Sequence, residues 1–111
     1  MTEGIIKFGQ RICLPVAGVY ANGRKALALV DVVSREPIAN ATVNLPEHDC
    51  GDDEIFVKDW SENASMVDAL LDAGLIEFPH GAESSGYVVV PRCRLTAAGR
   101  QLWRDEENAT D

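Results

Sequence analysis

An Asn22-Gly23 dipeptide stands between two apolar, β-forming segments and limits the possible folds more than any other part of this chain. Asn and Gly both tolerate positive φ, which a type I′ turn requires, so the pair is a strong hairpin signal. The flanking segments, residues 11–20 and 25–33, are therefore predicted to be antiparallel strands. Pro15 cannot donate to a strand ladder, so the first of them is predicted to be an edge strand or to carry a bulge.

A second turn extends this hairpin into a meander. The Ser-Arg-Glu-Pro sequence at residues 34–37 indicates a turn, and residues 38–45 contain the β-formers Thr42 and Val43. Residues 25–33 have apolar side chains at both odd and even positions, which indicates a central strand. A short apolar segment at residues 5–8 is expected to be a first strand or arm.

The second half of the chain mixes strand and helix patterns. Residues 54–58 predict a short strand, and Ser61 or Asn63 is expected to cap a helix that runs to about Ala73. Gly74 is the expected stop signal. The apolar residues of this helix have helical spacing and predict one buried stripe: Met66, Val67, Leu70 and Leu71.

The remaining segments complete the fold prediction. Residues 79–85 are expected to be a loop, and a strand at about residues 86–95 precedes a short helix at 97–104. The sequence therefore predicts a single α+β domain over residues 1–104, with residues 105–111 as a polar C-terminal tail. Its expected architecture is an antiparallel meander of five or six strands, with one main helix on one face and a short C-terminal helix.

Charge is distributed unevenly along the 111 residues, whose formal net charge is −8. Residues 47–77 contain ten acidic groups and a single basic one, whereas residues 1–46 contain five basic groups and three acidic ones. Such a block is either a solvated surface or a face that attracts a basic partner. The acidic balance argues against a protein that neutralises phosphates. The predicted partner-binding residues are Glu47, Asp49, Asp52, Asp53, Asp59, Trp60, Glu62, Asp68 and Asp72.

Trp60 has two possible interpretations, because it stands where the strand at 54–58 meets the helix. It is either a core residue or an exposed anchor for a partner.

No strong catalytic motif is present, and the chain is expected not to be an enzyme. The acidic residues near Gly51 do not match a calcium-binding loop, and His48 with Cys50 lacks a second pair of zinc ligands. We therefore expect no metal and no cofactor. The three cysteines form no CxxC pair and are expected to be reduced thiols. Cys13 and Cys93 fit apolar strands, while the carboxylates around Cys50 are expected to raise the pKa of its thiol.

Targeting signals are not evident in the sequence. No apolar run approaches the roughly 18–20 residues of a membrane span. The first residues lack the basic region and long apolar core of a signal peptide. The expected location is the cytoplasm, with no membrane partner.

One part of the chain is similar to winged-helix DNA-binding regulators. In those proteins a helix ends in Gly-Leu-Ile, two strands form a wing, and Arg-Leu-Thr opens the next helix; residues 74–76 and 94–96 have these sequences. This resemblance implies duplex DNA binding. However, a winged helix also needs a helix-turn-helix upstream, where strands are predicted, and its groove-facing helix would carry Asp68 and Asp72. A winged-helix regulator therefore remains an alternative.

A second resemblance covers about residues 19–95. Its central signature is the run FVKDWSEN at residues 56–63, and its other segments are 20–31, 36–39, 42–46, 73–76, 86–88 and 90–91. These segments resemble a family of small proteins of unknown function that are carried by phages, plasmids and other mobile elements. The resemblance implies a meander-plus-helix domain and an accessory role in mobile DNA, with no reaction and no catalytic residues.

These expectations combine into one hypothesis. The chain is a non-enzymatic, protein-binding accessory protein of a phage or mobile element, and it inhibits a host defence system of the anti-CRISPR or anti-restriction type. Its acidic middle third mimics nucleic acid and occludes a basic channel on a host nuclease or CRISPR complex, with no direct nucleic-acid binding. A homodimer is compatible with this hypothesis. A further alternative is a small-molecule sponge or sensor, with a pocket between sheet and helix or at an oligomer interface.

Overall fold

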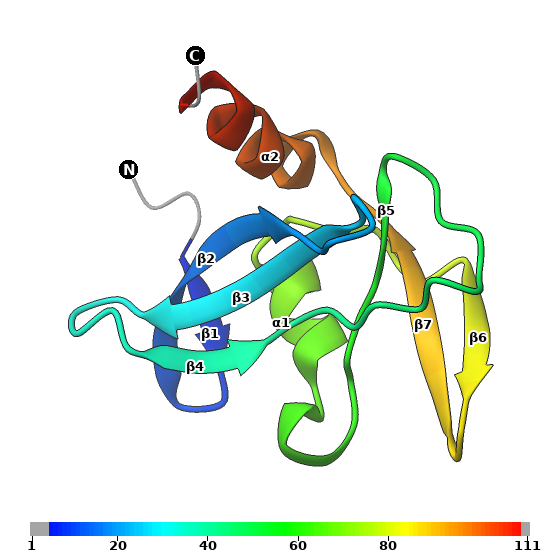
Figure 1. The fold of residues 1–111 in the computed structure, drawn as a ribbon. Coiled ribbons are helices and arrows are strands. Elements are labelled where there is room, and N and C mark those ends of the chain that lie inside the picture. Colours follow the sequence, from blue (N-terminus) through cyan, green and yellow to red (C-terminus); the bar gives the residue numbers. More distant parts are fainter. Residues whose placement is uncertain (1–4, 110–111) are drawn as a thin grey trace.

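The computed structural model describes residues 5–109, and over this range it contains seven antiparallel strands in two sheets and two α-helices (Figure 1). The first sheet has the order β1-β2-β3-β4 and the second the order β5-β7-β6. The predicted α+β class is therefore confirmed. In chain order the elements are β1 (Ile6–Phe8), β2 (Arg11–Val19), β3 (Lys25–Asp31), β4 (Pro37–Asn40), β5 (Glu54–Phe56), the 3₁₀ turn η1 (Ser61–Asn63), α1 (Met66–Asp72), β6 (Gly81–Ser85), β7 (Val88–Arg94) and α2 (Ala97–Ala109).

The predicted hairpin between β2 and β3 is present, but its turn is not type I′. Gly23 has a φ of 86°, whereas Asn22 is not among the residues with positive φ. The Gly23 N–H donates to the Tyr20 carbonyl, and the Tyr20 N–H donates to the Arg24 carbonyl, both at 2.8 Å. This is a three-residue loop with glycine in the left-handed position. Asn22 contributes through its side chain, whose Oδ1 accepts from the Arg24 N–H at 3.1 Å, so it needs no positive φ.

Pro15 lies in a strand that has neighbours on both sides, because β2 stands between β1 and β3. The prediction of an edge strand is therefore wrong for β2 as a whole. Within residues 5–109, however, the pairing of β2 with β1 covers only residues 11–13. Pro15 lies past the end of the β1–β2 pairing and, among the described residues, pairs only with β3, at Leu29. The proline thus occupies a local edge, where its missing N–H costs no hydrogen bond to β1.

The helix α1 begins several residues after the predicted caps, Ser61 and Asn63. Ser61 and Ser65 both have positive φ, 55° and 78°, and these conformations interrupt any continuous helix from residue 61. Ser65 provides no side-chain cap. The Asp59 Oδ1 instead accepts from the Val67 N–H at 3.0 Å, so a residue outside the predicted helix caps it.

The segment at residues 81–85, predicted as part of a loop, forms β6 and pairs with β7. Its Gly-Ala-Glu-Ser-Ser sequence has little intrinsic preference for strand. A two-residue turn at Gly86 and Tyr87 brings it beside β7, and Gly86 supplies the positive φ of 61° that such a turn needs. Pairing with an apolar neighbour therefore decides the structure of this segment.

The C-terminal helix is longer than predicted, since α2 continues past Arg104 to Ala109. Residues 105–109 of the predicted polar tail are thus the last part of α2. Residues 110–111, and residues 1–4 of the predicted domain, lie outside the described residues. No helix in the described part of the chain is long and apolar enough to cross a membrane.

The main hydrophobic core joins the first sheet to both helices and to the second sheet. Met66 and Leu70 of α1 are fully buried, as their spacing predicted, while Val67 and Leu71 are half-buried at its margin. A second, smaller cluster consists of Leu45, Phe56 and Val90. The fully buried side chains of the main core include Ile6, Cys13, Leu27, Leu29, Ile55, Met66, Leu70, Cys93 and Leu95.

Candidate functional site

The predicted partner-binding residues fall into two groups of four carboxylates. We call residues 46–53 the acidic loop, which carries Glu47, Asp49, Asp52 and Asp53. We call residues 59–72 the acidic helix segment, which carries Asp59, Glu62, Asp68 and Asp72. In Figure 1 the acidic loop rises on the right of β5 and enters it from the top, and the chain then runs down through β5 to η1 and into α1. The structure therefore places the two groups at opposite ends of β5 and does not bring all eight carboxylates together.

The acidic loop is held in place by basic residues from the β2–β3 hairpin. The Arg24 guanidinium donates to the Leu45 carbonyl at 3.3 Å and to the His48 carbonyl at 2.7 Å. The Lys25 ammonium donates to the Asp52 carbonyl. These contacts bring two positive charges beside the loop, because Asn22-Gly23 turns the chain toward it. The hairpin signal and the acidic block, 20–30 residues apart in sequence, thus meet in space.

The second sheet brings one cation and one further carboxylate to the loop. Asp53 lies 3.4 Å from the Arg94 guanidinium, and His48 lies 3.3 Å from Glu83 of β6. Among the described residues no cation forms an ion pair with Glu47 or Asp49, and both side chains are exposed. Asp52 is exposed as well, and only its backbone carbonyl meets a cation. Within residues 5–109 the loop therefore combines three carboxylates that have no ion pair with basic groups that lie beside it.

Glu54, which follows the loop, is a half-buried carboxylate whose contacts close the loop. Its Oε1 accepts from the Gly51 N–H at 2.8 Å, and its Oε2 lies 2.5 Å from the His80 ring. The Gly51 hydrogen bond, reinforced by His80, lowers the pKa of Glu54 below its ordinary value. The ionised carboxylate is thus the form that the folded loop stabilises.

The acidic helix segment has far fewer cations around it. Lys58 pairs with Glu62 at 3.2 Å, four residues apart. Asp68 and Asp72 are exposed on α1 one turn apart, and within residues 5–104 no cation pairs with either. Asp59 differs from them, because its carboxylate caps α1 at the Val67 N–H. Three carboxylates of this segment are therefore available at the surface, and one is structural.

Trp60 lies between the two predicted roles. It is half-buried and packs against the second hydrophobic cluster, as Cys50 also does. One part of the Trp60 side chain is therefore buried in this cluster, and another part is exposed to solvent. Trp103, in contrast, is only 6% exposed, and its Nε1–H donates to the Gly18 carbonyl at 2.8 Å.

The cysteines do not provide a reactive thiol. All three are free. Burial raises the pKa of the Cys93 thiol to about 12, and burial also raises the pKa values of Cys13 and Cys50. The predicted direction for Cys50 is right, but its main cause is burial, and the Glu54 carboxylate is a lesser one. Among the described residues, no group of three or more His, Cys, Asp or Glu side chains is placed to hold a metal ion.

The structure upstream of α1 differs from that of a winged-helix protein. The order α1, β6–β7 hairpin, α2 agrees with that resemblance. However, between residues 5 and 60 the structure contains strands and loops, with no helix. A helix-turn-helix is thus missing from the described residues, and α1 presents Asp68 and Asp72 at its surface.

Two exposed apolar regions were not among the predicted site residues. Tyr87 and Val89 on the β6–β7 hairpin, with Phe78 just before it, are strongly exposed. Ile12 and Val16 are exposed on β2. The alternation of side chains along β2 and β7 was the sequence signal that could have found them.

No family model, no curated protein and no solved structure matches this chain. Its fold and surface define a small α+β protein with an unevenly neutralised acidic surface. The resemblance to proteins of mobile elements stays a prediction.

Proposed function

We propose that this chain is a non-enzymatic binding protein that docks its acidic helix segment against a basic surface of another protein. The observation that carries this proposal is the exposure of Glu62, Asp68 and Asp72 with Lys58 as their one cation partner among the described residues. The unpaired carboxylates of Asp68 and Asp72 on α1, with Glu62 of η1 beside Lys58, create a negative potential, which speeds and orients the approach of a positive partner.

The proposed partner is the nucleic-acid channel of a host defence nuclease or CRISPR complex. Such a channel binds phosphates and is therefore lined by basic side chains. The net charge of −8 and the free carboxylates supply the same sign as the nucleic acid. In this proposal the chain acts in the host cytoplasm as an accessory protein of a phage or mobile element, and it inhibits by occlusion.

The acidic loop contributes less to this docking. Arg24, Lys25 and Arg94 lie beside it and offset much of its charge. A basic channel would therefore meet cations at the loop and carboxylates at the helix. This difference makes the loop a matched control for the helix.

A pull-down from nuclease-treated host lysate tests the proposal, with the full tagged chain as bait and mass spectrometry as readout. The helix variant is Asp68→Asn with Asp72→Asn, and the loop control is Glu47→Gln with Asp49→Asn; both remove two charges. We expect the wild-type chain and the loop control to retain the same protein, and the helix variant to retain about tenfold less. Equal retention by the helix variant, or recovery that depends on intact DNA, would contradict the proposal.

A further inference from the structure

The first sheet has one apolar face that nothing within residues 5–109 covers. The side chains of α1 and Trp103 of α2 belong to the same buried cluster as Cys13, Leu27 and Leu29, so these residues mark the inner face. In Figure 1, α1 lies behind the strands β2 and β3. Because side chains alternate along a strand, the neighbouring positions point to the opposite side, which we call the outer face. Its β2 and β3 residues are Ile12, Leu14, Val16, Gly18, Ala26, Ala28 and Val30, and the register adds Lys7 of β1 opposite Ile12 and Pro37 and Asn40 of the edge strand β4.

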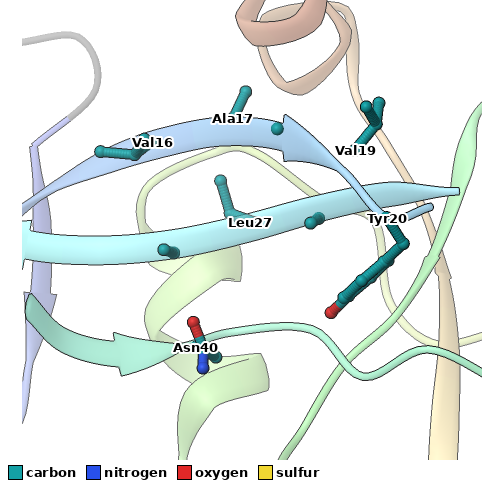
Figure 2. Close-up of a pocket in the computed structure, with 9 residues that line it drawn as sticks. Val16, Ala17, Val19, Tyr20, Leu27 and Asn40 are labelled. Atoms are coloured by element: carbon teal, nitrogen blue, oxygen red, sulfur yellow. The ribbon is translucent and has the colours of Figure 1, made fainter. Parts of the chain in front are cut away.

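The outer face is bulky at one end and hollow at the other. Ile12 and Val16 stand out from it, 38% and 48% exposed. Toward the other end of β2, the small residues Gly18, Ala26 and Ala28 form the floor of a shallow hollow of about 270 Å³. Figure 2 shows this hollow with Val16, Tyr20 and Asn40 among the residues around it.

We propose that the outer face is the interface of a homodimer. A two-fold axis through the face would turn the second copy end for end, since each residue of such an interface meets the partner surface that its own copy also presents. The bulky Ile12 end of each copy then lies over the Ala26 and Ala28 hollow of the other. The face is self-complementary in shape in this orientation.

Charge also favours a second copy as the occupant. Two chains of net charge −8 repel each other wherever their carboxylates meet. The outer-face residues include no carboxylate, and the acidic loop and acidic helix segment lie on other elements. The one charged residue of this largely apolar face is Lys7, so the face does not select a basic partner and allows two acidic chains to associate.

The size of the face sets the expected strength of the dimer. The four strands contain 23 residues in all, so at about 4.8 Å between strands and about 3.3 Å per residue they present roughly 360 Å² per copy. Two copies would then bury about 700 Å², which is well below the roughly 1,200–2,000 Å² of stable interfaces, so the association is expected to be weak and reversible. We therefore expect association that depends on concentration.

The dimer leaves the proposed binding surface free, because α1 packs behind the inner face of each copy. Two acidic helix segments would lie on opposite sides of the dimer and would make it bivalent. The dimer does not rest on the proposed function, and each can fail without the other.

Analytical ultracentrifugation of the full chain, from micromolar to submillimolar concentration, tests the interface. We expect the wild-type mass to rise toward that of two copies, and Val16→Lys to weaken association by at least about tenfold. The matched control is Val89→Lys, which adds the same charge at a 65% exposed position of β7 and should leave association unchanged. Circular dichroism of each variant verifies folding.

A second variant protects the test against a folding defect of Val16→Lys. Asn40→Lys replaces an exposed polar residue beside the hollow and should weaken association in the same way. A wild-type chain that stays monomeric at all concentrations would overturn the proposal. A dimer that resists both outer-face variants, or that Val89→Lys disrupts equally, would overturn it too.

Discussion

The acidic loop and the acidic helix segment carry four carboxylates each, yet they meet different surroundings. Arg24, Lys25 and Arg94 reach the loop from other parts of the chain, whereas the helix segment has Lys58 as its cation partner among the described residues. The loop is an acidic sequence with three cations beside it, although among the described residues Asp53 is its one carboxylate in an ion pair. The helix segment is acidic both in sequence and in space, so charge along the chain alone does not locate an acidic surface.

The two regions also depend on different interactions for their shape. Cationic side chains that donate to backbone carbonyls hold the loop, together with the Glu54 contact to Gly51. The helix segment depends on its Asp59 cap and on Asn63, which is buried and donates to the Asn40 carbonyl at 2.6 Å. Substitutions that act on one set of contacts should therefore leave the other region intact.

The largest expected effect comes from Trp103→Ala, which removes a buried aromatic side chain. Trp103 fixes α2 to the Gly18 carbonyl, and the Lys25 ammonium lies 5.9 Å from its ring centroid. We expect the free energy of unfolding to fall by about 3–5 kcal/mol, with Lys25 and the loop loosened as well. Urea denaturation measures this change. The half-buried Trp60→Ala should cost less, and an equal loss in both variants would contradict the assignment of Trp103 to the core.

Arg24→Met is expected to have the next largest effect, because it removes the donor to the His48 carbonyl of the loop and to the Leu45 carbonyl just before it. Hydrogen bonds to charged groups contribute about 1.5–3 kcal/mol, so we expect a loss of about 2 kcal/mol. Hydrogen exchange should become faster in residues 46–53 and stay unchanged in α1. Arg11→Met, at an exposed side chain 3.9 Å from Asp31, is the control. Equal acceleration in loop and helix would show that the two regions are not independent.

Asp59→Ala is the converse of Arg24→Met, because it should destabilise the acidic helix segment and leave the acidic loop unchanged. Loss of a cap costs about 1 kcal/mol, and the Val67 amide should exchange faster while the loop is unaffected. Asp68 lies on the same segment, but its carboxylate does not cap the helix. Asp68→Ala should therefore change the free energy of unfolding by only a few tenths of a kcal/mol. If Asp68→Ala costs as much as Asp59→Ala, the cap is not the cause.

The smallest expected effect is a pH dependence located at the loop. The pKa of Glu54 is lowered on folding, so its stabilising contribution is present above its ordinary pKa and is lost as the pH falls through the folded value. Wild-type stability should therefore decline between pH 6 and about pH 3 more than that of Glu54→Gln. Denaturant titrations at several pH values measure the slope. The exposed Glu47→Gln should keep the wild-type slope.

Much of the fold could be predicted because its signals are local. Gly74 has a φ of 76° and ends α1 where the sequence placed the stop. Helical spacing identified Met66 and Leu70 as core residues, and alternation identified Cys13 and Cys93. Glycine conformation and apolar periodicity act within a few residues, so they can be seen without the fold.

The errors arose where distant residues decide the structure. β6 has a weak strand sequence and exists because β7 pairs with it. The start of α1 depends on Asp59, six residues before Ser65, and on two serines with positive φ. Local propensity is a weak guide wherever a tertiary contact supplies more free energy than the propensity itself.

For the candidate site, too, some features follow from local sequence and others from tertiary contacts. The sequence alone established the α+β class, the hairpin at Asn22-Gly23 and the position of the acidic block along the chain, because each follows from residue type and spacing. Only the tertiary structure decided which carboxylates remain free, since Arg94 of β7 pairs with Asp53, and Arg24 approaches the loop from the β2–β3 turn; both are far from the loop in sequence. Ion pairing depends on distances of a few ångströms, and the folded chain alone sets those distances.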